Sequence, residues 1–171
     1  CHKFTLPDEK YVFHLTKAAR KGHTTALENA LGRFLIGGGL DNINPKLALE
    51  IYNEAKASNP ALSLYKEEKT LRIMKMSVEM SIGLGPFDAG KFREKYKIRE
   101  PDREPGEIDG HYFIWSLAEE ACRGGRFGKP NRKLTFQLII RGGSVTGEFE
   151  SAIEKAYKKW KDDEPYQFVI D

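Results

Sequence analysis

The sequence predicts an α+β fold: an N-terminal group of about three helices, followed by a small antiparallel or mixed sheet that is packed by helices. Three observations predict this class. Residues 1–60 carry apolar side chains at helical spacing, residues 74–84 alternate apolar and polar side chains without a break, and residues 149–160 return to helical spacing. With 171 residues, 40% of them hydrophobic, the chain is long and apolar enough for one folded domain. We expect a single domain, with a helical part over about 1–60 and a sheet-containing part over about 61–171.

The first part of the chain is expected to form three helices. The first follows Pro7, and the second has Thr24 or Thr25 as its N-cap and ends at the glycines 37–39. Because these glycines follow a helix and no Gly-Lys-Ser or Gly-Lys-Thr element accompanies them, they indicate a helix end or a hinge and not a phosphate-binding loop. The third helix begins at Asn44, a residue common at helix N-caps, with Pro45 at its first position.

Three strands are expected in the second part. The clearest runs over 74–84, where all three methionines of the chain fall on the apolar face of a period-two pattern. The second runs over 134–140 and the third over 166–170, and a helix over 149–160 would cover the sheet. Residues 111–122 are ambiguous, since their first half favours a strand and their second half a helix.

The segment most suggestive of a partner is residues 123–133, RGGRFGKPNRK, which holds five cations, one aromatic residue and no acid. The whole chain carries a formal charge of only +3, so its basicity is local. Cationic side chains displace counterions from phosphates, and an aromatic face can stack on a base. The segment therefore predicts a non-enzymatic domain that binds RNA or DNA phosphates through a flexible basic loop. The expected contact residues are Arg123, Arg126, Phe127, Lys129, Arg132, Lys133 and Arg141, with Lys10, Lys17, Arg20 and Lys21 as an extension of the same patch.

Two other interpretations stay open. The basic loop could instead dock an anionic membrane or an acidic protein, as in a structural or matrix-like assembly protein, and this interpretation is compatible with a homo-oligomer. Alternatively, the chain could be an enzyme whose site is built around His111, with Asp109 and Cys122.

The sequence has no pattern that indicates a metal site, a disulfide framework or a membrane span. The histidines at 2, 14, 23 and 111 share no metal-ligand spacing, so we expect no metal and no cofactor. Two cysteines cannot build a disulfide framework, which favours an intracellular location in the cytoplasm or nucleus. No apolar run approaches the length of a membrane span. Since the chain begins with Cys1, we expect it to be a fragment or a processed chain.

Overall fold

The computed structural model describes residues 8–37, 39–99, 109–142 and 149–168. Within these ranges the protein is all-α, with nine α-helices and no strand, so the predicted α+β class is wrong. The elements in chain order are α1 (Asp8–Arg20), α2 (Thr24–Gly32), the π-helical turn η1 (Arg33–Gly37), α3 (Gly39–Asn42), α4 (Pro45–Ser58), α5 (Glu67–Leu84), α6 (Ala89–Tyr96), α7 (Asp109–Arg123), the 3-10 turn η2 (Gly125–Phe127), α8 (Arg132–Gly142) and α9 (Phe149–Lys161).

The three N-terminal helices are present as α1, α2 and α4. The predicted cap of α4 is confirmed, because the Asn44 side chain accepts a hydrogen bond from the Leu47 amide at 3.1 Å and Pro45 opens the helix. The start of α2 is capped differently from the expectation. Here His23 Nδ1 accepts a hydrogen bond from the Ala26 amide at 3.2 Å, so a histidine takes the place of the expected threonine.

The expected strand over 74–84 is the second half of α5. Its buried residues are Ile73, Met74, Ser77, Met80 and Leu84, which recur at helical and not at alternate spacing. The period-two pattern instead distributes apolar residues around the helix, so that Ile82 is 70% exposed. Gly83 lies within this helix, and the lack of a side chain lets the Trp160 ring of α9 pack against it. A Cβ at Gly83 would lie 2.3 Å from Trp160 Cζ2.

The expected strand over 134–140 is α8. Every residue from Leu134 to Ile140 is buried, including Thr135 and Gln137, so the polar residues of the alternation do not face water. A helix that is buried on all sides has no polar stripe from which its period could be read. Residues 111–122 lie in α7, and the described part of the third expected strand, 166–168, is not a strand; residues 169–171 lie outside the described ranges.

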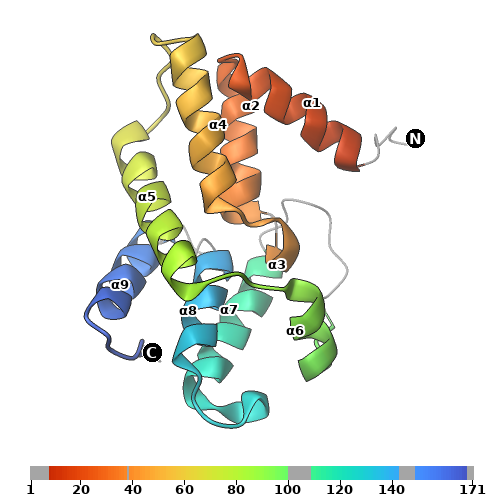
Figure 1. Ribbon diagram of the computed structural model, residues 1–171, viewed down its shortest axis with the longest axis vertical. Helices are drawn as coiled ribbons and strands as arrows, with labels where there is room; N and C mark the ends of the chain where they lie inside the picture. Colours follow the sequence, from red (N-terminus) through yellow and green to blue (C-terminus); the bar gives the residue numbers. More distant parts are fainter. Residues whose placement is uncertain (1–7, 38, 100–108, 143–148, 169–171) are drawn as a thin grey trace.

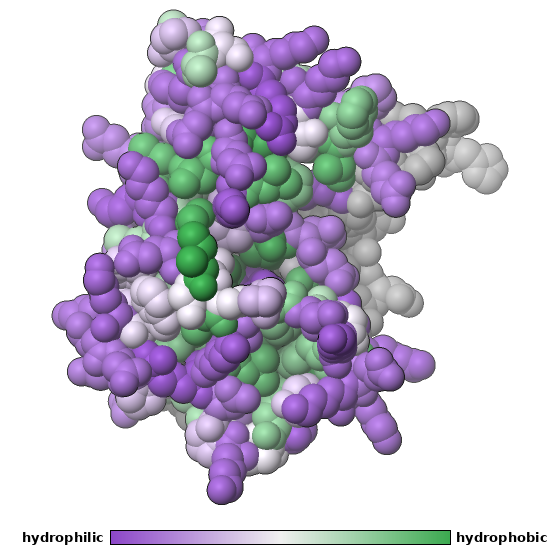
Figure 2. Space-filling view, viewed as in Figure 1, coloured by the Kyte–Doolittle hydropathy of each residue, from purple (hydrophilic) through white to green (hydrophobic). Residues whose placement is uncertain are grey.

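The buried side chains form two cores, and α5 contributes to both. Figure 1 shows α1, α2 and α4 together at one end of the molecule, with α6, α7 and α8 at the other. The first core, which we call the upper core, is built by the first group and includes Leu27, Ile51 and Met74. The second, the lower core, is built by the second group with α9 and includes Ile73, Met80 and Phe136. On the face shown in Figure 2, hydrophilic residues dominate the rim and apolar surface is visible in the middle.

Candidate nucleic-acid interface

The basic segment is a closed turn that joins α7 to α8 at the lower end of the molecule (Figure 1). The Gly124 amide donates to the Glu120 carbonyl at 2.8 Å, and the Asn131 amide donates to the Ala121 carbonyl at 2.9 Å. Gly124 has a φ of 107°, and a Cβ there would lie 2.6 Å from the Gly128 carbonyl oxygen, so this position requires glycine. The expectation of a flexible loop tied to a sheet is therefore corrected: the segment is a hydrogen-bonded turn between two helices.

Phe127 fixes the turn to α6. Its side chain is only 9% exposed, and its ring stacks on Phe92 with the centroids 5.9 Å apart. It also meets the Tyr96 ring edge-on at 4.7 Å. Since Phe127 is buried among aromatic residues, it presents no free face on which a base could stack. It acts instead as the anchor that brings the basic turn against α6.

Two of the predicted arginines lie against acidic residues of α7. The Arg123 guanidinium lies 2.8 Å from Glu119 Oε1, one helical turn away. The Arg126 side chain pairs with Glu120 at 2.9 Å, and the backbone amide of Arg126 donates to the same carboxylate. Hydrogen bonds from Arg126 lower the pKa of the Glu120 carboxyl against the opposing effect of its desolvation. The positive charge of these two arginines is therefore partly neutralised within the protein.

Arg132 is tied to the C-terminal end of α9. Its Nη2 donates to the Trp160 carbonyl at 2.9 Å and its Nε donates to the Glu164 carbonyl at 3.2 Å. A guanidinium satisfies terminal helix carbonyls and opposes the negative end of the helix dipole. This side chain also lies over the Phe136 ring at 4.9 Å, so Arg132 holds α8 and α9 together.

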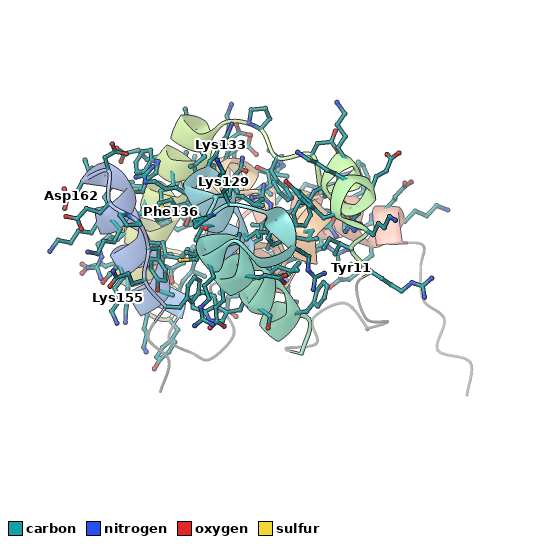
Figure 3. The ribbon with its side chains drawn as sticks, turned by 90° about the horizontal axis from the view of Figure 1, so that it is seen from below. Tyr11, Lys129, Lys133, Phe136, Lys155 and Asp162 are labelled. Atoms are coloured by element: carbon teal, nitrogen blue, oxygen red, sulfur yellow. The ribbon has the colours of Figure 1, made fainter. Side chains whose placement is uncertain are left out.

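Lys129 and Lys133 are the two cations of the turn that pair with no other described residue. Both are exposed, and neither forms a hydrogen bond or an ion pair with any residue that the structure describes. Figure 3 shows both on the same side of the molecule, away from Lys155 and Asp162 at α9. Of the seven predicted contact residues, these two have the accessibility and the free charge that a phosphate contact requires.

A third cation, which was not predicted from the sequence, lies beside the turn. Lys95 on α6 is exposed and lies 5.2 Å from the centroid of Tyr96, whose ring also contacts Phe127. Because Phe127 bridges to α6, a lysine some thirty positions earlier in the sequence comes next to the basic turn. No local pattern could have signalled this proximity, which follows from the packing of three aromatic rings. We refer to Lys95, Lys129 and Lys133 as the lysine surface.

The other predicted cations lie elsewhere. Arg141 is at the opposite end of α8, nine residues from Arg132 and therefore roughly 14 Å along the helix axis. Lys10, Lys17 and Arg20 lie on α1, and Lys21 follows it, at the end of the molecule farthest from η2 (Figure 1). The prediction that these residues extend one continuous patch is therefore wrong.

The fold does not bring together the three residues of the predicted enzyme site. Asp109 and His111 are in the first turn of α7, whereas Cys122 is near its end, roughly 16 Å away along the axis from His111. The Cys122 thiol donates to the Tyr166 carbonyl at 2.7 Å, and its burial raises the pKa of the thiol, which disfavours the nucleophilic thiolate. Among the described residues, no group of histidine, cysteine and acidic side chains could hold a metal ion.

None of the helices in the described ranges combines the length and the apolar character needed to cross a membrane. No protein-family model matches the chain, and no curated protein or solved structure matches it either. Its function therefore has to be inferred from its own residues.

Proposed function

We propose that the chain is a non-enzymatic domain that binds the phosphate backbone of RNA or DNA through the lysine surface. The observation that carries the proposal is that the acid-free turn leaves Lys129 and Lys133 exposed and without an ion-pair partner among the described residues. Free lysines give up condensed counterions when they meet phosphates, whereas an arginine already paired to a carboxylate has to exchange one partner for another.

The rigidity of the turn supports the same proposal. Phe127 and the hydrogen bonds of Gly124 and Asn131 hold the backbone of the turn in place, so little backbone entropy is lost when a phosphate binds. The contacts would be made to the backbone and not to base edges, because the aromatic residue of the turn is buried. We therefore expect little sequence preference and strong salt dependence.

The test is charge reversal of the two free lysines. In a Lys129→Glu/Lys133→Glu variant, the affinity for a fluorescently labelled oligonucleotide is expected to fall at least about tenfold at low salt. The slope of the logarithm of the binding constant against the logarithm of salt concentration should become shallower by roughly 1.5, because two phosphate contacts are lost. Fluorescence anisotropy over a salt series measures both quantities.

The matched control is Lys10→Glu/Lys17→Glu, which changes the net charge by the same amount on α1 at the opposite end of the molecule. This variant should retain the salt slope of the unmodified protein. Equal losses in the two variants would show that only net charge matters, and would contradict the lysine surface. Binding to anionic vesicles without any binding to the oligonucleotide would also contradict the proposal.

A further inference from the structure

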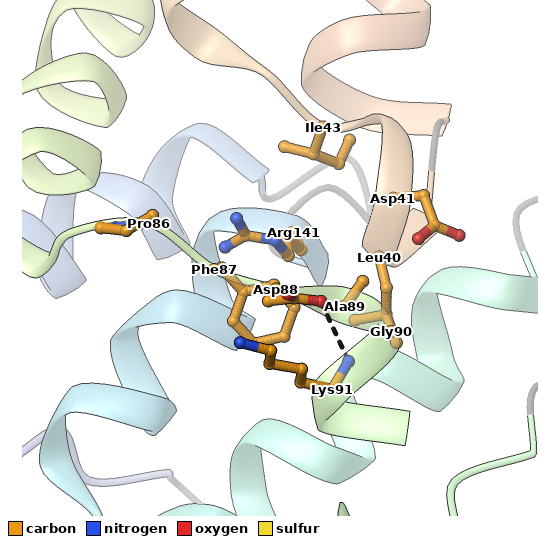
Figure 4. A pocket seen from close by; sticks show the side chains of 10 residues that line it. All are labelled: Leu40, Asp41, Ile43, Pro86, Phe87, Asp88, Ala89, Gly90, Lys91 and Arg141. Atoms are coloured by element: carbon orange, nitrogen blue, oxygen red, sulfur yellow. Dashed lines mark hydrogen bonds between the residues drawn. The ribbon is translucent and has the colours of Figure 1, made fainter. Parts of the chain in front are cut away.

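A second feature with the character of a binding site is a pocket at the other end of α8. It has a volume of about 600 Å³ and lies between α3, the start of α6 and the end of α8 (Figure 4). This volume is in the range of pockets that take small molecules, and it far exceeds the space of a single water molecule. The residues that bear on ligand binding are Asp41, Pro86, Phe87, Asp88, Lys91 and Arg141.

Arg141 is the unusual member of this pocket, because its charge has no acidic partner among the described residues. Its Nη1 donates to the Gln137 carbonyl at 2.7 Å, one turn earlier in α8. Its Nε is buried and has no hydrogen-bond partner in the described part of the chain. Its guanidinium carbon lies 4.1 Å from the centre of the Phe87 ring. Burial lowers the pKa of Arg141 to about 10, as expected for a cation held away from water.

The acids of the pocket are already engaged by other groups. Asp41 forms a two-pronged pair with Arg93, with distances of 2.9 Å and 2.7 Å, which lowers the pKa of its carboxyl. Asp88 caps α6, since its Oδ1 accepts the Lys91 amide at 3.0 Å. The Lys91 side chain is exposed at the mouth and adds a second positive charge. The pocket therefore contains a partly buried cation that lacks a counter-charge among the described residues.

Part of the remaining lining is apolar and accessible. Pro86 is exposed and Phe87 is partly exposed, and the guanidinium of Arg141 lies over the Phe87 ring, as Figure 4 shows. An inorganic ion alone would leave these walls in contact with water. An anion carried on an aromatic or aliphatic group would satisfy both the unpaired charge and the apolar surface.

We propose that this pocket binds a small organic anion, whose phosphate or carboxylate group pairs with Arg141 and whose apolar part lies against Phe87 and Pro86. Arginine is suited to this role because its planar fork matches the two oxygens of either group. The site is distinct from the lysine surface, since Arg141 and Lys133 lie near opposite ends of α8. The proposal stands without the nucleic-acid interface.

A ligand-binding arginine and a structural arginine predict opposite effects on stability. Replacing a partly buried cation that has no acidic partner by an apolar side chain of similar length is neutral or stabilising when the cation is not needed for the fold. We therefore expect Arg141→Met to melt at or above the temperature of the unmodified protein while it loses anion binding. A structural role predicts a lower melting temperature.

The experiment uses isothermal titration calorimetry with four probes: phenyl phosphate, benzoate, inorganic phosphate and benzyl alcohol. Phenyl phosphate and benzoate should both bind saturably, and the tighter of the two identifies the preferred anionic group. Inorganic phosphate should bind more weakly because it lacks the apolar body, and benzyl alcohol more weakly because it lacks the charge. Arg141→Met should weaken the preferred probe at least about tenfold, the equivalent of one charge-assisted hydrogen bond.

Two further variants keep the proposal testable if Arg141→Met fails to fold. Arg141→Lys retains the charge without the fork, and Phe87→Leu retains an apolar wall without the ring; both should weaken phenyl phosphate. The matched control is Arg72→Met, because Arg72 is an exposed arginine that pairs with Glu154 between α5 and α9. It should leave the affinity unchanged. Equal affinity in the unmodified protein and all pocket variants, or no saturable binding of either aryl anion, would overturn the proposal.

Discussion

Phe127 shows how a single residue of the basic segment can have a role opposite to the one its surroundings suggest. An aromatic residue among cations and glycines is typical of a stacking platform for bases. Here the neighbouring glycines allow a tight turn, and this turn directs the ring inward to Phe92 and Tyr96. The aromatic residue therefore anchors the turn that carries the cations and is itself buried.

Truncation of this side chain tests the anchoring role. We expect Phe127→Ala to lower the free energy of unfolding by about 3 kcal/mol, because it removes a ring packed into the lower core. Phe13→Ala is the control: Phe13 is 61% exposed, so its loss should change the free energy by less than about 0.5 kcal/mol. Urea denaturation of the two variants measures the difference. Unchanged stability in Phe127→Ala together with weaker oligonucleotide binding would restore Phe127 as a stacking residue.

At the scale of elements, local sequence signals correctly predicted the N-terminal helices. The spacing of the apolar residues, in contrast, predicted strands where the structure has α5 and α8. The cap at Asn44 and the proline after it act within one turn, so they can be interpreted without knowledge of the fold. In α5, the alternation of Met74, Met76, Val78 and Met80 imitates a strand. Two residues depart from that alternation: Ile73 enters the lower core, and Ser77 is buried although a strand would place it on the polar face.

The candidate site was predictable to a similar degree. The segment itself could be identified from composition, because charge and glycine content are local properties, but composition did not distinguish its two free lysines from its paired arginines. The ion pairs of Arg123 and Arg126, the link of Arg132 to α9 and the proximity of Lys95 could not, since each depends on which helices pack together. The Arg141 pocket combines residues from three helices that are separated by up to a hundred positions, and no local pattern connects them.

The junction of α4 and α5 is held by a polar cluster with a pH dependence. The Tyr52 hydroxyl donates to Glu67 Oε1 at 2.5 Å, and Lys56 Nζ lies 3.0 Å from the same oxygen. Lys56 also donates to the Leu62 carbonyl, so the cluster fixes the connection between the two helices. The hydrogen bond from Tyr52, followed by that from Lys56, lowers the pKa of Glu67. Burial and then Glu67 raise the pKa of Tyr52 to about 12.

Glu67→Gln should change how stability depends on acid. Because the pKa of Glu67 is lower in the folded state than its ordinary value of 4.5, the unfolded state binds more protons below that pH. The stabilisation from the Glu67 carboxylate is therefore complete above about pH 4.5 and is lost as the pH falls through the lower folded value. We expect Glu67→Gln to be less stable than the unmodified protein at pH 7, and the difference to shrink below pH 4.5.

Glu68→Gln is the matched control, because Glu68 is exposed in the same turn and contacts no described partner. Its stability curve should run parallel to that of the unmodified protein. Urea denaturation at a series of pH values measures all three curves. A constant difference between Glu67→Gln and the unmodified protein across this range would show that the carboxylate charge does not stabilise the junction.

At the scale of the whole molecule, α5 connects the two cores, and among the described residues it is the one helix that contributes buried side chains to both. Consecutive residues of a helix point about 100° apart, so Ile73 can enter the lower core while Met74 enters the upper one. Both are almost fully buried, at 1% and 0% exposure. If either core unfolds, α5 loses packing contacts, and the other core also depends on α5. We therefore expect both cores to unfold together.

The two tryptophans allow this cooperativity to be measured. Trp115 and Trp160 both pack against the lower core, so their fluorescence reports on that core alone, whereas far-UV circular dichroism reports on all helices. Leu27→Ala should lower the free energy of unfolding by about 2–5 kcal/mol, because Leu27 is fully buried in the upper core. If α5 couples the cores, the fluorescence and dichroism midpoints shift together by the same urea concentration. Ile82→Ala, at an exposed site on α5, should shift neither. If the cores unfold independently, Leu27→Ala instead gives an early dichroism transition and leaves the tryptophan midpoint in place.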